Sequence, residues 1–198
     1  MNTGPPALPA SPSSNRPSGS TRTQPILTGG RIWLRPLCLA DAPAIFAWLD
    51  EPTARRLTGT HAQHSLGDVE AHCARIELAE DRYDYAIMLD QDLIGEVVLN
   101  AIDWANKSSS LRIAIWDPAL RDHGFGTEAI RLLVDFAFSI LELNRIELEV
   151  FDFNPRARHV YEKIGFRWEG TRREALFWAG EFVDAHILGL LRNDDVAK

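Results

Sequence analysis

The sequence predicts a mixed α+β sheet in a single domain. A length of 198 residues is that of one domain with a tail. Strand patterns in the first half of the chain are separated by hairpin-length turns, and a strand–helix–strand unit follows in the second half. Two cysteines, Cys38 and Cys73, are too few for a disulfide framework. We therefore expect a hydrophobic core, a reducing compartment and a cytoplasmic location.

The start of the chain differs in composition from the rest. Residues 1–30 hold six of the 11 prolines, no Asp or Glu, and only Arg16 and Arg22 as charged side chains. Such a segment has too little apolar surface to offset the entropy of ordering. We expect residues 1–29 to form a disordered tail and residues 30–198 to form the folded domain. The start lacks the apolar stretch of a secretory signal, and no apolar run approaches the roughly 20 residues that span a bilayer.

The first half of the domain shows local strand and helix signals. Residues 31–37 alternate and predict a strand, and residues 40–49 predict a short helix. Ser65 and Asp68 have the spacing of a helix N-cap, and the apolar stripe that follows consists of Val69, Cys73 and Ile76.

Three further strands follow this helix. The apolar runs 85–89 and 93–99 flank Asp90-Gln-Asp92, which predicts a hairpin. Residues 111–116 are apolar almost throughout, as in a central strand.

The second half of the domain changes from hairpins to a crossover. Residues 126–141 show the apolar face of a long helix, and residues 145–150 alternate as a strand. A strand, a helix and a strand in this order form a βαβ unit, whose two strands are parallel. A short helix over 155–163 and strands near 166–168 and over 183–190 complete the predicted order.

The segment with the clearest chemistry is Arg121-Asp-His-Gly-Phe-Gly-Thr-Glu128, which precedes the long helix. Gly124 and Gly126 leave backbone N–H groups free to point into one concavity at a helix N-terminus. There the unpaired N–H groups and the helix dipole favour an anion, and Arg121 adds a positive charge. The loop therefore predicts a phosphate or pyrophosphate site, or else a loop that merely turns tightly. It lacks the Gly-Lys-Ser/Thr of a Walker loop and the third glycine of the Rossmann fingerprint.

This loop and a second block together resemble the GNAT superfamily of acetyl-CoA-dependent N-acetyltransferases. Arg121, Gly124 and Gly126 match the family's Arg/Gln-x-x-Gly-x-Gly/Ala signature. The segment from Asn154 to Phe166 is similar to the family's Asn-x-x-Ala/Ser block that ends in Tyr-x-x-x-Gly-Phe. The resemblance covers residues 31–191. Its C-terminal part resembles the group that contains the RimJ/RimL ribosomal-protein acetyltransferases and the spermidine acetyltransferases.

The resemblance implies a fold, a cosubstrate and a set of site residues. The fold is a mostly antiparallel sheet with a central, splayed parallel strand pair and flanking helices. Acetyl-CoA is the implied cosubstrate, and no metal is implied. The loop amides that would hold the CoA pyrophosphate belong to His123, Gly124, Phe125, Gly126 and Thr127. The strand edge that would pair with the pantetheine amides comprises Ala114, Ile115 and Trp116. Asn154 would hydrogen-bond the pantetheine arm, and Tyr161 would protonate the leaving thiolate.

Basic side chains gather in the C-terminal third of the chain: Arg156, Arg158, Lys163, Arg167, Arg172 and Arg173. One or two of them, Arg156 first, are candidates for contacts with the 3′-phosphate or the pyrophosphate of CoA. We expect the others to pair with nearby carboxylates.

The general base has no direct counterpart in this sequence. Many GNAT relatives carry a glutamate at the start of the central strand, where this chain has Leu111. Glu96 on the preceding strand is the substitute we consider, acting through water, and its alternative role is that of a solvated strand residue. Deprotonating a lysine-like amine of pKa about 10.4 at pH 7 costs about 4.6 kcal/mol, whereas an α-amine of pKa about 8 costs about 1.4 kcal/mol. We therefore favour a protein or peptide N-terminal amine as acceptor. The alternatives are a polyamine or other small amine, and a CoA-binding sensor without catalysis.

Other classes of partner are disfavoured. A net charge of −7 argues against nucleic acid, and we expect no membrane partner. His61, His64 and His72 lack the tight pairs and the second half-site of a zinc centre, so we predict no metal site. A homodimer stays open as an assembly.

Overall fold

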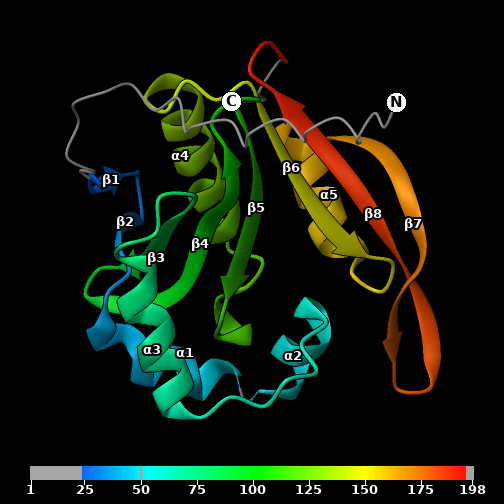
Figure 1. Ribbon diagram of the computed structural model, residues 1–198, viewed down its shortest axis with the longest axis horizontal. Coiled ribbons are helices and arrows are strands. Elements are labelled where there is room, and N and C mark those ends of the chain that lie inside the picture. The colour runs from blue at the N-terminus through cyan, green and yellow to red at the C-terminus, as the bar shows by residue number, and fades with distance from the viewer. Residues whose placement is uncertain (1–23, 50, 195–198) are drawn as a thin grey trace, which may run out of the picture.

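The computed structural model describes residues 24–49 and 51–194, which form an eight-stranded sheet in the order β1-β2-β3-β4-β5-β6-β8-β7 (Figure 1). The pairing of β5 with β6 is parallel, and every other pairing is antiparallel. The predicted fold class is thus confirmed. In chain order the strands are β1 Leu27–Thr28, β2 Trp33–Pro36, β3 Tyr83–Leu89, β4 Asp92–Asp103, β5 Ser108–Ile115, β6 Arg145–Phe151, β7 Arg167–Trp178 and β8 Glu181–Leu191.

Helices cover the sheet from two sides and divide the buried side chains into two cores. The main core lies between the sheet and the helices α4 and α5. The second core is smaller and gathers α1, α3 and Trp116. The helices are α1 Ala42–Leu49, α2 Pro52–Thr58, α3 Leu66–Ile76, α4 Phe125–Ser139 and α5 Pro155–Ile164, with 3-10 turns η1 Leu39–Asp41 and η2 Pro118–Leu120.

The predicted helix starts and apolar faces are confirmed at α3 and α4. The hydroxyl of Ser65 accepts from the Asp68 N–H at 3.2 Å, and the Asp68 carboxylate accepts from the Ser65 N–H at 2.8 Å. These two bonds complete a capping box. The α3 stripe is buried, and so is the α4 face that includes Ile130, Leu133 and Val134.

The parallel pair β5–β6 is short. Only Ser108–Ser110 of β5 is in register with β6, at Arg145–Glu147. Beyond Ser110 the two strands diverge, as Figure 1 shows, while β5 stays paired with β4 and β6 stays paired with β8. The sheet therefore opens between two walls, each of which keeps its own antiparallel neighbour.

The domain begins earlier in the chain than the composition suggested. β1 pairs with β2, and the Gln24 amide donates to the Asp84 carbonyl at 2.8 Å. The end of the expected tail, residues 24–29, is thus part of the folded domain, because paired backbone stabilises this short edge strand. The rest of that tail, residues 1–23, lies outside the described residues.

Two other elements differ from the sequence expectations. α2 was not predicted, and β7 continues to Trp178, well beyond the expected 166–168. The long β7–β8 hairpin twists away from the body of the molecule at its far end (Figure 1).

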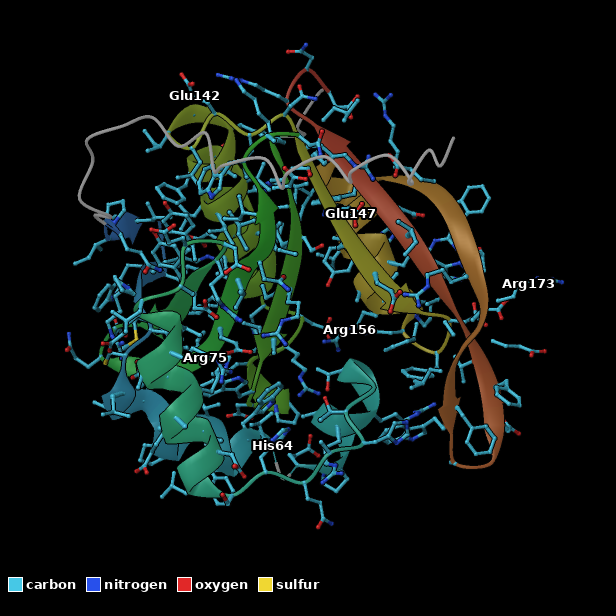
Figure 2. All side chains as sticks on the ribbon, in the orientation of Figure 1. His64, Arg75, Glu142, Glu147, Arg156 and Arg173 are labelled. Atoms are coloured by element: carbon cyan, nitrogen blue, oxygen red, sulfur yellow. The ribbon has the colours of Figure 1, made fainter. Side chains whose placement is uncertain are left out.

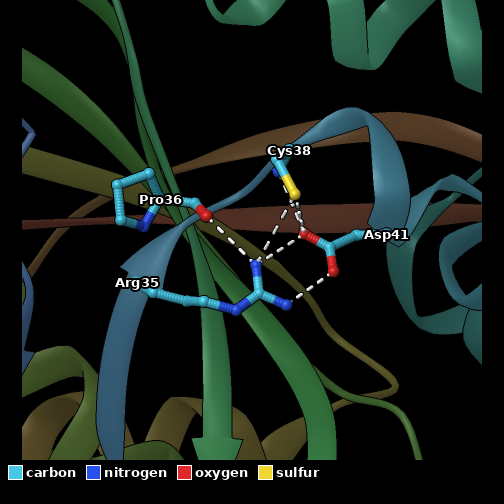
Figure 3. A network of polar contacts seen from close by, with 4 residues as sticks. All are labelled: Arg35, Pro36, Cys38 and Asp41. Atoms are coloured by element: carbon cyan, nitrogen blue, oxygen red, sulfur yellow. Dashed lines mark hydrogen bonds and ion pairs between the residues drawn. The ribbon is translucent and has the colours of Figure 1, made fainter.

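A buried ion pair joins β2 to the start of the α1 segment (Figure 3). The Arg35 guanidinium donates to both Asp41 oxygens, at 2.7 and 2.6 Å, and the Cys38 N–H donates to the same carboxylate at 2.9 Å. Burial alone would raise the pKa of Asp41, but these hydrogen bonds outweigh it and hold the pKa below its usual value. The pair fixes the second core against the sheet.

Candidate functional site

The predicted glycine loop leads into the N-terminus of α4. Gly124 is the N-cap residue, with φ of 83°, and it caps the helix without a side chain. The first N–H groups of α4 have no partner within the helix, as at any helix start. A Cβ on Gly126 would meet only Ile113 and Ile115, both at an ordinary 3.7 Å. The fold therefore has room for a side chain at 126, and glycine there leaves the backbone amides open to a ligand.

Arg121 connects this loop to the end of β5. Its Nε donates to the carbonyl of Ile115 at 3.1 Å, and its Nη2 donates to the carbonyl of Trp116 at 3.2 Å. The guanidinium also lines the cleft described below. Arg121 thus fixes the loop and places its charge beside it.

The residues of β5 whose backbone groups face away from β4 are not the ones that the sequence predicted. The Trp116 N–H donates to the Ile94 carbonyl at 2.9 Å, so Trp116 directs its backbone to β4. The carbonyl of Ala114 also faces β4, since a Cβ on Gly95 would lie 2.2 Å from it. Backbone groups alternate in direction along a strand, so Ile113 and Ile115 face the gap instead. The backbone that faces the gap is therefore that of Ile113 and Ile115, whereas the sequence predicted Ala114, Ile115 and Trp116.

The opening between β5 and β6 continues into a cleft of about 1420 Å³. Its walls come from α1, α2 and α3, from β4, β5 and β6, and from the glycine loop and α5. All predicted site residues except Trp116 and His123 line this cleft. Trp116 instead stacks on Trp48 in the second core, with ring centroids 5.8 Å apart. His123 stacks on Phe125 at 6.0 Å.

Asn154 and Arg156 stand at the start of α5. The Asn154 side-chain oxygen accepts from the Ala157 N–H at 3.2 Å and caps the helix. Its amide N–H donors are not used by this cap and are available to an acceptor. Arg156 pairs with Asp122 of the loop at 2.9 Å, and Figure 2 shows it beside the gap between β5 and β6. This exposed pair links the two walls.

Tyr161 of α5 is buried, with 8% of its surface exposed, and lines the cleft. Its ring meets Phe166 edge-on at 6.0 Å. Burial raises the pKa of Tyr161 to about 12, so the phenol stays protonated at neutral pH. A protonated hydroxyl at this position can donate a hydrogen bond to an anion that develops in the cleft.

Glu96 of β4 faces the same cleft with 15% of its side chain exposed. Burial raises the pKa of its carboxyl; Arg112, 3.6 Å away, opposes the shift and Asp84 adds to it. A carboxylate with a raised pKa is a better proton acceptor near neutral pH than an ordinary one.

Most carboxylates that line the cleft have an arginine partner, whereas Asp68 accepts from Ser65. Asp84 accepts both hydrogen bonds of Arg82 at 2.7 Å, and Glu149 pairs with Arg172. Glu147, labelled in Figure 2, pairs with Arg145 at 3.0 Å. The sequence reading missed Asp84, although a lone charge in the buried run Tyr83–Leu89 was a usable signal.

Comparison with known proteins decides the family. The model of the acetyltransferase (GNAT) domain matches residues 31–167, more than half of the chain. This chain belongs to the GNAT acetyltransferase family. It is an acyltransferase, as its N-acetyltransferase homologues indicate.

Two curated relatives and one solved structure illustrate the likeness of this GNAT protein. The probable N-acetyltransferase YjcK of Bacillus subtilis is 36% identical over 86% of this chain and 99% of its own length. YdaF of the same organism, named provisionally as a ribosomal N-acetyltransferase, is 32% identical over 54% of this chain and 58% of its own. The crystal structure of spermidine N-acetyltransferase from Vibrio cholerae with CoA and spermine has a TM-score of 0.78 and 27% identity, and the match covers 82% of this chain and 96% of that one. Placement of the chain with the RimJ/RimL enzymes stays a prediction.

The described part of the GNAT chain also bears on metal sites and membrane spans. Within residues 24–49 and 51–194, no three His, Cys, Asp or Glu side chains are grouped so as to hold a metal ion. In the same part of the chain, the helices are too short or too polar to cross a membrane.

Proposed function

We propose that the chain acetylates the N-terminal α-amine of a peptide or protein, with acetyl-CoA bound along the gap between β5 and β6. The single observation that carries this proposal is the cleft that Glu96, Tyr161 and the glycine loop all line. The amine attacks the thioester carbonyl, its proton is lost, and the C–S bond breaks to release CoA.

The residues present fit acetyl-CoA. The open amides at the start of α4 suit a pyrophosphate, because unpaired N–H groups and the helix dipole both favour an anion. The gap-facing backbone of Ile113 and Ile115 suits the amides of pantetheine, which can pair like an added strand. The free side-chain amide of Asn154 lies across the gap, at the start of α5.

The two titratable side chains have complementary roles. Glu96 accepts the amine proton, directly or through water, and the raised pKa of its carboxyl suits that task. Tyr161 donates a hydrogen bond to the sulfur as negative charge develops there. Because its own pKa is about 12, Tyr161 stabilises the thiolate more readily than it surrenders a proton to it.

The charge pattern of the cleft favours a peptide N-terminus over a polycation. A polyamine presents several cationic nitrogens, which require several unpaired carboxylates. Asp84, Glu96 and Glu149 each face an arginine instead. A peptide carries one amine together with backbone N–H and C=O groups, which such mixed, neutral pairs can bind. An α-amine also costs less to deprotonate at pH 7 than an alkylamine.

A polyamine is the second candidate acceptor. The likeness to the Vibrio cholerae spermidine acetyltransferase structure, at 27% identity and a TM-score of 0.78, favours it. That likeness covers the fold, and the acceptor of this chain depends on the side chains of its own cleft.

A screen by CoA release distinguishes these acceptors. Unacetylated peptides with varied first residues, the same peptides with blocked N-termini, spermidine and spermine are incubated with acetyl-CoA and the full chain. We expect turnover on free peptides and none on blocked ones. Turnover confined to the polyamines would overturn the α-amine proposal in favour of the second candidate.

The Glu96→Gln variant tests the proposed base. Because burial raises the pKa of Glu96, the rate should fall as the pH drops through a value above the ordinary 4.3 or so of a glutamate. Glu96→Gln should lower kcat by about 10²–10⁴-fold and remove this acid limb. Glu162→Gln is the matched control, since Glu162 is partly exposed, pairs with Arg158 and does not line the cleft. An unchanged pH profile in Glu96→Gln would exclude Glu96 as the base.

A further inference from the structure

We infer that Arg31 and Glu128 form a clasp that holds the glycine loop in its ligand-binding conformation. The clasp comprises these two side chains and the Gly29–Gly30 turn that precedes Arg31 in the chain. It acts on the peptide bond between His123 and Gly124, and it positions that peptide rather than touching the cosubstrate. The inference rests on the proposed function, which places the CoA pyrophosphate at this loop.

The Gly29–Gly30 turn presents backbone N–H groups that bind the Glu128 carboxylate. One oxygen of Glu128 accepts from the N–H of Gly30 at 2.7 Å and from the N–H of Arg31 at 2.9 Å. The Gly29 N–H closes the turn by donating to the Ile32 carbonyl at 2.9 Å. A Cβ on Gly29 would lie 2.4 Å from the same Glu128 oxygen, so a side chain there would push the carboxylate away. Successive N–H groups that converge on one carboxylate make a tight anion grip.

The Arg31 side chain connects the bound Glu128 carboxylate to the glycine loop. Its Nε donates to the second Glu128 oxygen at 3.1 Å, and its Nη1 donates to the His123 carbonyl at 2.7 Å. Its guanidinium also lies over the Phe125 ring, 5.1 Å from the centroid. A charged donor, a fixed carboxylate and an aromatic face thus define where the His123 carbonyl points.

The direction of that carbonyl decides the direction of an N–H group in the loop. In a trans peptide the C=O and the following N–H point in opposite directions, and the described residues contain no cis peptide. Arg31 and Glu128 line a second hollow of about 550 Å³, which shares Gly124 and Thr127 with the cleft, and neither Arg31 nor Glu128 lines the cleft itself. Since the His123 carbonyl points to Arg31, the N–H of Gly124 points away from Arg31, and Gly124 is one of the residues that line the cleft. If Arg31 were lost, this peptide could rotate and turn a carbonyl toward the pyrophosphate.

The charge of Glu128 makes the inference testable. Burial would raise its pKa, but the bonds from Arg31, Gly30 and Ile32 outweigh burial and lower it, so Glu128 is ionised at neutral pH. If only long-range charge mattered at this loop, removing a carboxylate would strengthen the binding of an anion. If the clasp positions the loop, removing it weakens binding. The two accounts predict opposite signs for the same substitution.

The experiment measures the dissociation constant of CoA by calorimetry for the full chain and three variants: Glu128→Gln, Arg31→Met and Arg31→Lys. We expect Glu128→Gln and Arg31→Met each to weaken binding by about tenfold, the effect of losing one hydrogen bond to a charged group. Arg31→Lys keeps the charge but not the planar fork, and we expect it to behave like Arg31→Met. Arg167→Met is the matched control, because Arg167 is an exposed arginine that pairs with Asp194 at 3.1 Å.

A second acetyl donor distinguishes an effect on loop positioning from general damage to the protein. S-Acetylpantetheine carries the thioester and the pantetheine arm but no pyrophosphate. The clasp variants should raise KM for acetyl-CoA and leave kcat/KM for S-acetylpantetheine at the wild-type value. Tighter CoA binding by Glu128→Gln, or equal losses with both donors, would overturn the clasp. Should Glu128→Gln fail to fold, Arg31→Lys decides, because it keeps the positive charge while losing the planar fork, and Arg31 is 54% exposed. Wild-type CoA affinity in Arg31→Lys would then overturn the clasp. Absence of CoA binding by the wild-type chain would instead refute the proposed function on which the clasp depends.

Discussion

Two substitutions at Gly126 separate the needs of the fold from the needs of the ligand. Gly126 lies in the first turn of α4, and a Cβ there would meet Ile113 and Ile115 at 3.7 Å, an ordinary van der Waals distance. A helical backbone accepts alanine without strain, and replacing glycine reduces the entropy of the unfolded chain. Gly126→Ala should therefore stabilise the ligand-free protein by about 0.4–1 kcal/mol.

The same position should respond in the opposite sense to the cosubstrate. A Cβ at 126 obstructs the approach of pyrophosphate to the loop amides, so Gly126→Ala should weaken CoA binding. Gly126→Asp adds a negative charge close to the two negative charges of the bound pyrophosphate. Two unit charges about 4 Å apart interact by about 4 kcal/mol at an effective dielectric constant of about 20, and solvent in the open cleft reduces this. A loss of about 2–4 kcal/mol corresponds to a roughly 30-fold to 1,000-fold weaker affinity for CoA.

Thermal unfolding and calorimetry together test this pair of variants. Unfolding of the ligand-free proteins should give a Tm for Gly126→Ala at or above the wild-type value and show that Gly126→Asp is folded. Titration with CoA should then rank affinity as wild type, alanine, aspartate. Wild-type affinity in a folded Gly126→Asp protein would show that the pyrophosphate does not bind at this loop.

Three further predictions concern the Arg35–Asp41 ion pair, the Tyr161 hydroxyl and the start of the domain. Asp41→Asn leaves Arg35 without its carboxylate partner and should lower the free energy of unfolding at pH 7 by about 3 kcal/mol, as measured with denaturant. This is the lower end of the range for broken buried pairs, because the Arg35 side chain is 25% exposed. The folded pKa of Asp41 is lowered, so its contribution is present above about pH 4 and is lost as the pH falls; the difference from wild type should shrink accordingly. Tyr161→Phe should lower kcat by about 10²–10³-fold, the cost of losing one hydrogen-bond donor to a developing anion, while the CoA dissociation constant stays unchanged; a kcat within about threefold of wild type would leave Tyr161 a packing residue. Deleting residues 1–29 should lower the Tm by about 2–4 °C for each kcal/mol lost, since it removes β1 and the Gln24 bond, whereas deleting residues 1–23 should not; equal Tm values would show that β1 adds no stability.

Elements with a local signal were predictable from the sequence. α3 begins at a capping box formed by Ser65 and Asp68, and the apolar residues that follow have the helical period. The glycine loop was likewise visible, because Gly124 adopts a positive φ that glycine favours and α4 follows directly. In these cases neighbouring residues carry enough of the signal to predict the element.

α2 and β7 depend on distant parts of the chain. α2 has a cap, since the Glu51 carboxylate accepts from Thr53 and Ala54 N–H groups, but Ala54 is its only buried residue, so no apolar period marks it. Arg56 over the Phe153 ring, 4.6 Å from the centroid, supplies a contact that the local sequence does not reveal. β7 is largely exposed and lacks alternation, and it is a strand because β8 pairs with it.

The error at the strand edge has a more specific cause. The run 111–116 is almost wholly apolar, so its pattern carries no information on which residues face which neighbour. The hydrogen bond from Trp116 to Ile94 sets this phase, and it is a contact between strands. Once that bond is known, Ile113 and Ile115 follow as the residues whose backbone faces the gap.

The gap itself explains why a thioester on a long amide arm suits this fold. Backbone groups of Ile113 and Ile115 lack a β6 partner because the parallel register ends at Ser110, although the Ile115 carbonyl already accepts from the Nε of Arg121 at 3.1 Å. Unpaired backbone in a folded protein must find water or a ligand. The β4–β5 wall packs on α4 and the β6–β8 wall packs near α5, so each wall is stable without closing the gap. An extended arm with its own amides can satisfy the β5 edge, while its phosphate end reaches the start of α4. The glycine loop marks one end of this path in the sequence, whereas the path itself exists only because two strands from different parts of the chain meet briefly and then separate.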